Sequence, residues 1–240
     1  YGTTTYENVT STILFEVYCR ENNQSLYNNE ELTVGFEQET LVNFMNDMKT
    51  LHDAEAMPSI DSIIEQTSAE DSVFAKGEAA TIILYTDQIS TMETVMSKKL
   101  GFTILPGTAE TKAMYSKPSQ FLSIATTSES KDKAADYINR WINDIEINKI
   151  LLGRRGVPIS NTVVDEITPH LDDVGQRVFE YQKLVEQYAS PIDPPLPAGS
   201  AEVSDDFRKQ MEMLLYGEID VQKAAQNLIS NTAVFLQAAN

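Results

Sequence analysis

Residues 74–88 read FAKGEAATIILYTDQ, and this stretch decides the fold class. Gly77 ends a short helical pattern, and Thr81–Leu84 then form an apolar run without polar alternation. Such a run is typical of a strand that is covered on both faces. It stops on Tyr85, Thr86, Asp87 and Gln88, so an aromatic ring and three hydrogen-bonding side chains follow directly on a predicted buried strand.

Two further short runs resemble this strand. Phe102–Leu105 ends at Pro106 and Gly107, and Phe121–Ala125 follows some fifteen residues later. Since helical patterns separate the three runs, we expect an α/β layer rather than a helical bundle.

The remaining patterns predict helices. Thr4–Glu7 (TTYE) has the form of a capping box, so a helix is expected to begin near Thr5. Apolar residues at helical spacing predict further helices over 41–51, 134–145, 174–188, 207–215 and 221–229. The 134–145 helix carries Trp141, which is expected in the core. Pro191–Pro197 contains four prolines and is predicted to be extended.

The composition limits the possible partners. The chain has 240 residues, of which 36 are acidic and 18 are basic, giving a formal charge of −18. Because this charge repels phosphate backbones, nucleic acid is not an expected partner. The sequence contains no apolar stretch of about 20 residues that would span a bilayer. Cys19 is the only cysteine and leaves the redox compartment undecided.

The usual catalytic signatures are missing from the sequence. It contains no GxSxG, P-loop, GxGxxG or HExxH motif, and one cysteine with two distant histidines does not form a common zinc set. Adjacent acids such as Asp172–Asp173 and Asp205–Asp206 are more typical of a solvated helix start than of acid/base catalysis. We therefore predict no catalytic residue, no metal site and no cofactor.

Several segments together resemble one protein family. They are Phe74–Ala80 before an apolar strand, Phe102–Pro106, Ile124–Ile138, Arg155–Ser160 and Tyr216–Ala225. In this order, over about residues 26 to 240, they are similar to the extracellular solute-binding proteins of ABC sugar importers, which are related to maltose-binding protein. The resemblance implies an α/β fold of the periplasmic-binding-protein type II class, mainly the C-terminal lobe, helix-rich around a small mixed sheet.

The resemblance also implies a division of the chain. Residues 1–118 would form the first part of the C-terminal lobe, and residues 167–240 its helical return. Residues 119–166 would be a hinge-crossing segment that packs on an absent N-terminal lobe. The chain is thus expected to be a C-terminal fragment of a receptor whose first lobe carries the export signal and often a lipid-anchor cysteine.

The same resemblance suggests ligand-binding residues. Tyr85 would stack on a sugar face, while Asp87 and Gln88 would bind hydroxyl groups. The alternative is a polar helix start in which Asp87 only caps. Weaker candidates are Tyr6, Ser119, Gln120, Glu202 and Arg208. Arg208 could equally pair within its own helix, with Ser204 or Asp205.

The implied function is a carbohydrate-binding receptor that closes on its ligand and delivers it to the transmembrane subunits of an ABC permease. It would lie outside the cell or in the periplasm, held to the membrane only through the absent anchor, and would not be an enzyme. Two alternatives remain: a hydrolase that uses paired carboxylates on carbohydrate, and a helical interaction module.

Overall fold

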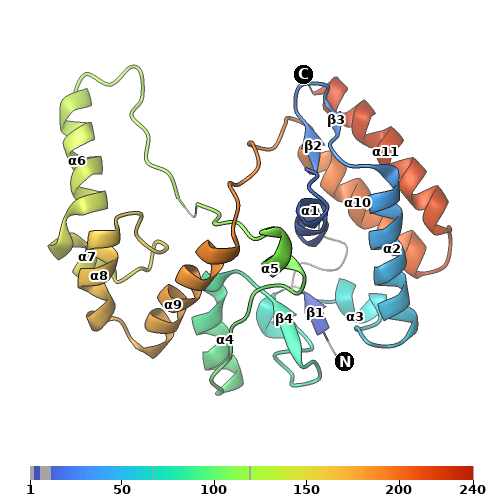
Figure 1. The fold of residues 1–240 in the computed structure, drawn as a ribbon, viewed down its shortest axis with the longest axis horizontal. Helices are drawn as coiled ribbons and strands as arrows, with labels where there is room; N and C mark the ends of the chain where they lie inside the picture. Colours follow the sequence, from blue (N-terminus) through green and yellow to red (C-terminus); the bar gives the residue numbers. More distant parts are fainter. Residues whose placement is uncertain (1–2, 6–11, 67, 119, 240) are drawn as a thin grey trace.

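The computed structural model describes residues 3–5, 12–66, 68–118 and 120–239. Its helices fall into two groups (Figure 1). The first and last helices of the chain lie together on one side, and helices α6, α7 and α8 lie on the other. Between them, helix α9 (Asp173–Tyr188) and the strand β4 (Thr81–Ile83) occupy the middle of the molecule.

The main hydrophobic core lies between four helices: α1 (Thr12–Glu21), α2 (Gln38–Asp53), α10 (Ser200–Leu215) and α11 (Val221–Ala238). Phe15 is fully buried at its centre. Its ring centroid lies 4.8 Å from Phe36, 5.0 Å from Phe44 and 5.6 Å from Phe207. The apolar spacing of the sequence therefore marked the faces that pack here.

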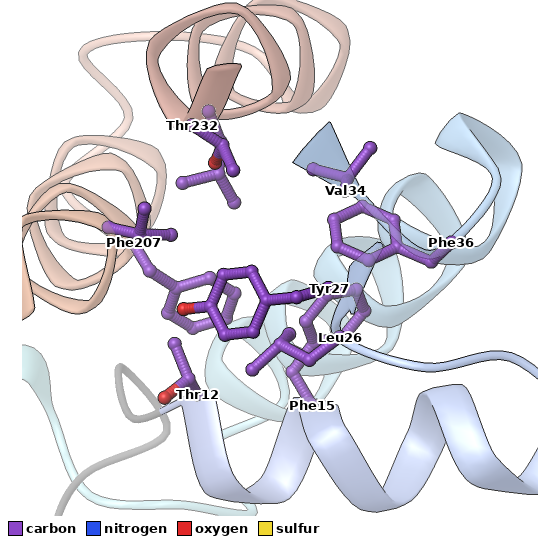
Figure 2. A pocket seen from close by; sticks show the side chains of 10 residues that line it. Thr12, Phe15, Leu26, Tyr27, Val34, Phe36, Phe207 and Thr232 are labelled. Carbon is purple, nitrogen blue, oxygen red and sulfur yellow. The ribbon is translucent and has the colours of Figure 1, made fainter. Parts of the chain in front are cut away.

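The core leaves almost no free space. Figure 2 shows the side chains around one gap in it, which come from α1, α10, α11 and the hairpin of β2 (Tyr27–Asn28) and β3 (Thr33–Val34) with its flanking residues. The gap offers about 10 Å³ to the centre of a water-sized sphere, which is room for about one water molecule. Gly199 shows the same tight packing, since a Cβ there would lie 2.6 Å from the Phe235 carbonyl oxygen. A sugar does not fit in this core.

The first strand of the chain corrects one prediction. Residues Thr3–Thr5 form strand β1, which pairs in parallel with β4 in the register Thr3–Thr81, Thr4–Ile82 and Thr5–Ile83. The expected helix start at Thr5 is therefore wrong, and the first described helical residue is Thr12. A capping box is a local pattern, and here the pairing with a distant strand overrides it.

The predicted strand at 81–84 is confirmed, but it is only partly covered. Thr81 is exposed and Ile82 to Leu84 are half-buried. Two other strand predictions are wrong, because neither 102–105 nor 121–125 forms a strand in the structure. Within the described residues, the sheets are the β1–β4 and β2–β3 pairs.

Shorter elements connect these parts. They are α3 (Ile60–Ile64), η1 (Ala69–Asp71), η2 (Thr86–Gln88), α4 (Ile89–Met96) and α5 (Thr108–Thr111). After α5 the chain passes Met114, which pairs with Ala189 in an isolated parallel bridge. The Ser190 N–H donates to the Met114 carbonyl oxygen at 2.9 Å. The segments 113–117 and 189–193 therefore run side by side, and we call them the paired segments.

The chain between the paired segments forms α6 (Lys131–Asn143), α7 (Ile145–Leu151), α8 (Asn161–Ile167), η3 (Thr168–His170) and α9. Helices α8 and α9 share a small core that includes Val163, Ile167 and Phe179. Helix α6 has no buried residue. Trp141 is only half-buried, so its predicted place in the core is wrong. Asp172 does cap α9, as the acidic pair suggested, by accepting from the Gly175 N–H at 2.7 Å.

Candidate ligand-binding site

Tyr85 follows β4 and begins the short helix η2. Its backbone N–H donates to Gln88 Oε1 at 3.1 Å, so the Gln88 side chain caps this turn. Asp87 is exposed. The alternative of a polar helix start after the strand is therefore confirmed, but its capping residue is wrong: the capping group is Gln88, and Asp87 is exposed.

The ring of Tyr85 meets side chains from the first paired segment. Lys117 Nζ lies 5.4 Å from the centroid of the Tyr85 ring, within the range of a cation–π contact. Tyr115 lies in the same neighbourhood, and its hydroxyl donates to Glu16 Oε2 at 3.2 Å. Burial is the main cause that raises the pKa of Tyr115, and the charges of Glu16 and Tyr85 add to it. Tyr115 therefore stays a neutral hydrogen-bond donor at neutral pH.

Arg20 anchors this arrangement from helix α1. Its side chain is buried, with 7% of the residue exposed. Nε donates to the Ala113 carbonyl oxygen at 2.9 Å, and Nη1 donates to Asp193 Oδ1 at 2.6 Å. Nη2 donates to Ser190 Oγ at 2.6 Å and to the carbonyl oxygens of Ser190 and Pro191 at 3.3 Å and 3.0 Å. One guanidinium thus binds both paired segments.

The guanidinium of Arg20 also lies 5.0 Å from the centroid of the Tyr115 ring. Helix α1 therefore holds Tyr115 twice, through Arg20 at the ring and through Glu16 at the hydroxyl. We call Glu16, Arg20, Tyr85, Tyr115, Lys117 and Asp193 the Tyr85 cluster. It combines two aromatic rings with two cations and two carboxylates, from four separate parts of the chain.

Glu16 has an unusual charge environment. Burial raises the pKa of its carboxyl above the ordinary value, and the nearby Asp193 carboxylate acts in the same direction. The Tyr115 hydrogen bond and the charges of Arg20 and Lys117 lower it, but they do not cancel the effect of burial. The folded state therefore holds the Glu16 proton more tightly than the unfolded state does.

This difference predicts a pH-dependent stability. A carboxyl whose pKa is raised on folding favours the folded state fully below its unfolded pKa, and this contribution is lost as the pH rises through its folded pKa. Glu16→Gln keeps a hydrogen-bond acceptor for the Tyr115 hydroxyl, but its amide does not titrate in this pH range. We expect the variant to exceed the wild type in free energy of unfolding at pH 7 and to lose this advantage near pH 4. Urea unfolding across this range measures the difference.

Glu30→Gln is the control, because it removes one negative charge from an exposed loop of the same acidic chain. If both variants gain the same stability at pH 7, general charge repulsion explains the gain, and the burial of Glu16 does not.

Three of the five weaker sequence candidates lie within the described residues. Tyr6 and Ser119 lie outside the described residues. Gln120 is exposed beyond the first paired segment, and Glu202 is exposed in the first turn of α10. Arg208 contacts Glu212 at 3.1 Å and Asp205 at 3.5 Å, both within α10. Pairing within the helix thus accounts for its position, and its role as a ligand stays a prediction.

Five members of the cluster were not predicted from the sequence: Glu16, Arg20, Tyr115, Lys117 and Asp193. Arg20 had a detectable signal, because an arginine there continues the apolar face of Val17. Tyr115 and Lys117 had none, since they lie in a polar stretch between two elements. Their importance depends on the pairing of Met114 with Ala189, which joins positions far apart in the sequence.

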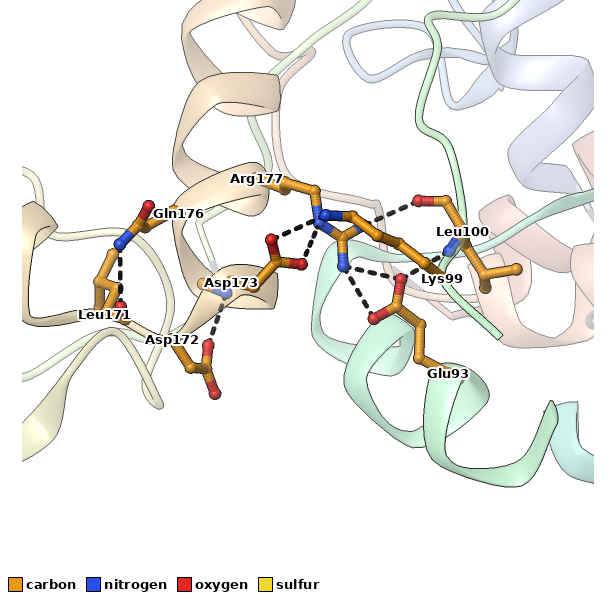
Figure 3. Close-up of polar contacts among 9 residues, drawn as sticks. Glu93, Lys99, Leu100, Leu171, Asp172, Asp173, Gln176 and Arg177 are labelled. Carbon is orange, nitrogen blue, oxygen red and sulfur yellow. Dashed lines mark hydrogen bonds and ion pairs between the residues drawn. The ribbon is translucent and has the colours of Figure 1, made fainter. Parts of the chain in front are cut away.

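A second groove lies between α9 and residues 100–102. It has a volume of about 260 Å³ and is lined by side chains that include Phe102, Arg177 and Tyr181. Figure 3 shows the polar contacts of Arg177. Its Nη2 lies 2.8 Å from both carboxylate oxygens of Glu93, and its Nη1 lies 2.7 Å from the Leu100 carbonyl oxygen. These contacts join α9 to α4, and the Arg177 guanidinium donates its hydrogen bonds to groups of the protein itself.

The described residues contain no group of three or more His, Cys, Asp or Glu side chains that could hold a metal ion. Nor does any helix there combine the length and the apolar character needed to cross a membrane.

Comparison with known proteins identifies the fold. No family model matches the chain. Among solved structures, it matches an extracellular solute-binding protein family 1 member from Alicyclobacillus acidocaldarius with a TM-score of 0.84 and 24% identity, over 99% of this chain. A periplasmic oligogalacturonide-binding protein from Yersinia enterocolitica, in complex with saturated digalacturonic acid, matches over 100% of this chain with a TM-score of 0.76 and 21% identity.

A de novo designed esterase also matches, over 99% of this chain, with a TM-score of 0.80 and 22% identity. The chain spans 60% to 61% of the length of these three structures. It therefore has the periplasmic-binding-protein-like fold, as the sequence predicted, and it corresponds to about three fifths of each matched protein.

Proposed function

We propose that this chain belongs to the extracellular solute-binding proteins of ABC importers and forms the larger part of a carbohydrate-binding receptor. The observation that carries this proposal is the Tyr85 cluster, in which an aromatic ring at the end of β4 meets polar side chains from the paired segments. The match to a protein solved with digalacturonic acid supports carbohydrate as the ligand class.

The chemistry of the cluster suits a sugar. A pyranose has apolar C–H faces and hydroxyl edges, so it needs a flat ring with hydrogen-bonding groups around it. Tyr85 offers the ring. The exposed Asp87 carboxylate accepts two hydroxyl hydrogens. The amide NH2 group of Gln88 donates to the sugar, because the cap uses the Oε1 atom of this side chain.

The ligand is proposed to lie between two lobes that close around it. In this proposal residues 1–118 and 167–240 form one lobe, and residues 119–166 pack mainly on the other. The half-covered face of α6 fits this division, because Tyr137 is 57% exposed and Trp141 is only half-buried. Closure would shield the sugar from water and strengthen its hydrogen bonds.

The proposed partners are the sugar and the transmembrane subunits of an importer, and the proposed place is outside the cell or in the periplasm. A lipid anchor in the full-length protein would keep the receptor near its permease. The match to extracellular and periplasmic binding proteins supports this location. We propose no covalent chemistry for the chain.

The test is a binding screen with the full-length protein against neutral and acidic mono- and oligosaccharides, including digalacturonate. For the best ligand, Tyr85→Ala should weaken binding by about 1–3 kcal/mol, since a desolvated aromatic anchor contributes this much. Tyr85→Phe should retain most of the affinity, because it keeps the ring. Isothermal titration calorimetry measures both.

Tyr216→Ala is the matched control, because it removes an exposed tyrosine at the end of α10 that is not part of the Tyr85 cluster. Equal affinity in wild type and Tyr85→Ala, with both proteins folded, would remove Tyr85 from the site. The absence of any sugar ligand in the screen would contradict the proposed function itself.

The rival function is hydrolysis of carbohydrate or ester bonds. Two observations favour it: Glu16 has a raised pKa beside the Asp193 carboxylate, and a designed esterase shares the fold. However, Asp193 is bound to Arg20 and Glu16 to Tyr115, so both carboxylates are engaged within the protein. Turnover of chromogenic glycosides or esters that is lost in Glu16→Gln would establish the rival.

A further inference from the structure

We propose that Arg20 is a positioning residue that fixes the two paired segments against helix α1 and thereby sets the relative placement of the two helical groups. It is not expected to touch the ligand. Its effect on sugar binding rests on the proposed function, whereas its effect on the geometry of the molecule does not.

The first argument is the position of the paired segments. The chain passes from α5 toward α6 through 113–117 and returns from α9 to α10 through 189–193. Everything between them, from Pro118 to Tyr188, belongs to α6, α7, α8, α9 and their connections (Figure 1). Any change in the angle between the two groups must therefore bend these segments or shift them against α1.

The second argument is the way in which Arg20 binds them. Its five hydrogen bonds reach one carbonyl oxygen in the first segment and four oxygen atoms of Ser190, Pro191 and Asp193 in the second. A guanidinium presents its donors in a rigid plane, so these bonds fix both the distance and the angle between the segments. An ammonium group has three donors on a flexible stem and cannot satisfy this set.

The third argument is the dependence of the partners on Arg20. Asp193 Oδ2 is buried, and no hydrogen bond to it is found within the described residues. The Asp193 carboxylate is therefore compensated by Arg20 through its other oxygen. Burying a carboxylate without its cation is costly, so loss of Arg20 should drive Asp193 toward solvent and separate the segments.

The fourth argument connects the segments to Tyr85. Arg20 contacts the face of Tyr115, and Glu16, one turn earlier on α1, binds its hydroxyl. Two residues further along the same segment, Lys117 lies over the Tyr85 ring. A shift of the segment relative to α1 would therefore move Tyr115 and Lys117 away from Tyr85. In this way a side chain that does not touch the ligand sets the geometry of the Tyr85 cluster.

The decisive experiment measures the distance between the two groups. Spin labels are placed at Lys133→Cys on α6 and Ser230→Cys on α11, both exposed positions. Cys19 is fully buried, and a labelling stoichiometry of two confirms that it stays unmodified. We expect one narrow distance distribution in the wild type. In Arg20→Met this distance distribution should broaden or shift. In Arg20→Lys the distribution should lie between those of the wild type and Arg20→Met.

Leu214→Ala controls for loss of stability, because Leu214 is fully buried in the main core on α10 and is not part of the paired segments. Its distance distribution should match the wild type. A folded Arg20→Met variant with an unchanged distribution would overturn the proposal. If Arg20→Met does not fold, Arg20→Lys and Asp193→Asn decide in the same way, since each removes part of the bond set.

Two further measurements distinguish a role of Arg20 in positioning the paired segments from a general loss of core packing. The charge of Arg20 lowers the pKa of Glu16, so the Glu16 carboxyl, followed by NMR, should titrate at higher pH in Arg20→Met and near the wild-type pH in Arg20→Lys. For a sugar identified in the screen, Arg20→Met should raise the dissociation constant by about tenfold, and Leu214→Ala should leave it unchanged. If no sugar binds, the proposed function fails while the distance measurement still decides the role of Arg20.

Discussion

Phe15→Ala is expected to lower the free energy of unfolding by about 3–5 kcal/mol, the usual range for removing a buried phenylalanine ring. Phe15 is fully buried and contacts three other rings, which come from α2, from α10 and from Phe36, two residues after β3. The gap already present beside it is small, so the core has little room to collapse into the new cavity. Urea unfolding followed by circular dichroism measures the loss.

Val234→Ala is the control, since Val234 lies on α11 with 63% of its surface exposed. It should change the stability only slightly. A loss below about 1 kcal/mol for Phe15→Ala would mean that the four helices do not pack around this ring, because cavities at such sites cost more.

Arg177→Met is expected to lower the free energy of unfolding by about 2–3 kcal/mol, because it leaves the partly buried Glu93 carboxylate without its cation. Glu93 Oε1 also accepts from the Leu100 N–H at 2.6 Å, so this carboxylate is confined where it lies. Hydrogen exchange should rise in α4 and in the first half of α9, which the ion pair joins (Figure 3). Denaturant unfolding and exchange mass spectrometry provide the two measurements.

Lys99→Met removes a neighbouring cation that pairs with the exposed Asp173 at 2.7 Å. It should have little effect on stability, since exposed ion pairs contribute little. If both variants lose the same stability, charge balance in this acidic chain explains the loss, and the Arg177–Glu93 pair does not.

The sequence was most informative where a pattern reported local packing. The apolar stripes of α2, α10 and α11 include Leu41, Phe44, Phe207, Met211 and Leu228, and all five are buried in the main core. A helix buries one face against its neighbours, so the spacing of its apolar residues survives in the fold. The two acids at Asp172 and Asp173 likewise marked the start of α9, because capping is also a local interaction.

Prediction failed where the structure depends on partners far along the chain. Thr3–Thr5 forms a strand because it pairs with Thr81–Ile83, and a capping-box pattern contains no information about that pairing. Phe102–Leu105 has the composition of a strand, yet a strand also needs a neighbour to bond with, and none pairs with it among the described residues. Local propensity gives the tendency of a segment but not its partner.

The candidate site also combines residues that were predicted from the sequence with residues that come together only in the fold. Tyr85 and Gln88 were predicted from a family resemblance and stay predictions as ligand contacts, although the structure places them together at the end of β4. Glu16, Arg20, Tyr115 and Lys117 could not be found in this way. They approach Tyr85 only because α1 and the paired segments converge, which no pattern in any one of these segments reveals.

The core is assembled from the beginning and the end of the sequence, and this affects synthesis on the ribosome. The apolar faces of α1 and α2 cannot be covered until α10 and α11 have been made, some 150 residues after α2. At typical elongation rates this interval is about 8–30 seconds. During this time Phe15 and Leu41 need a chaperone or a transient cover, and premature termination before α10 would leave a product prone to aggregation.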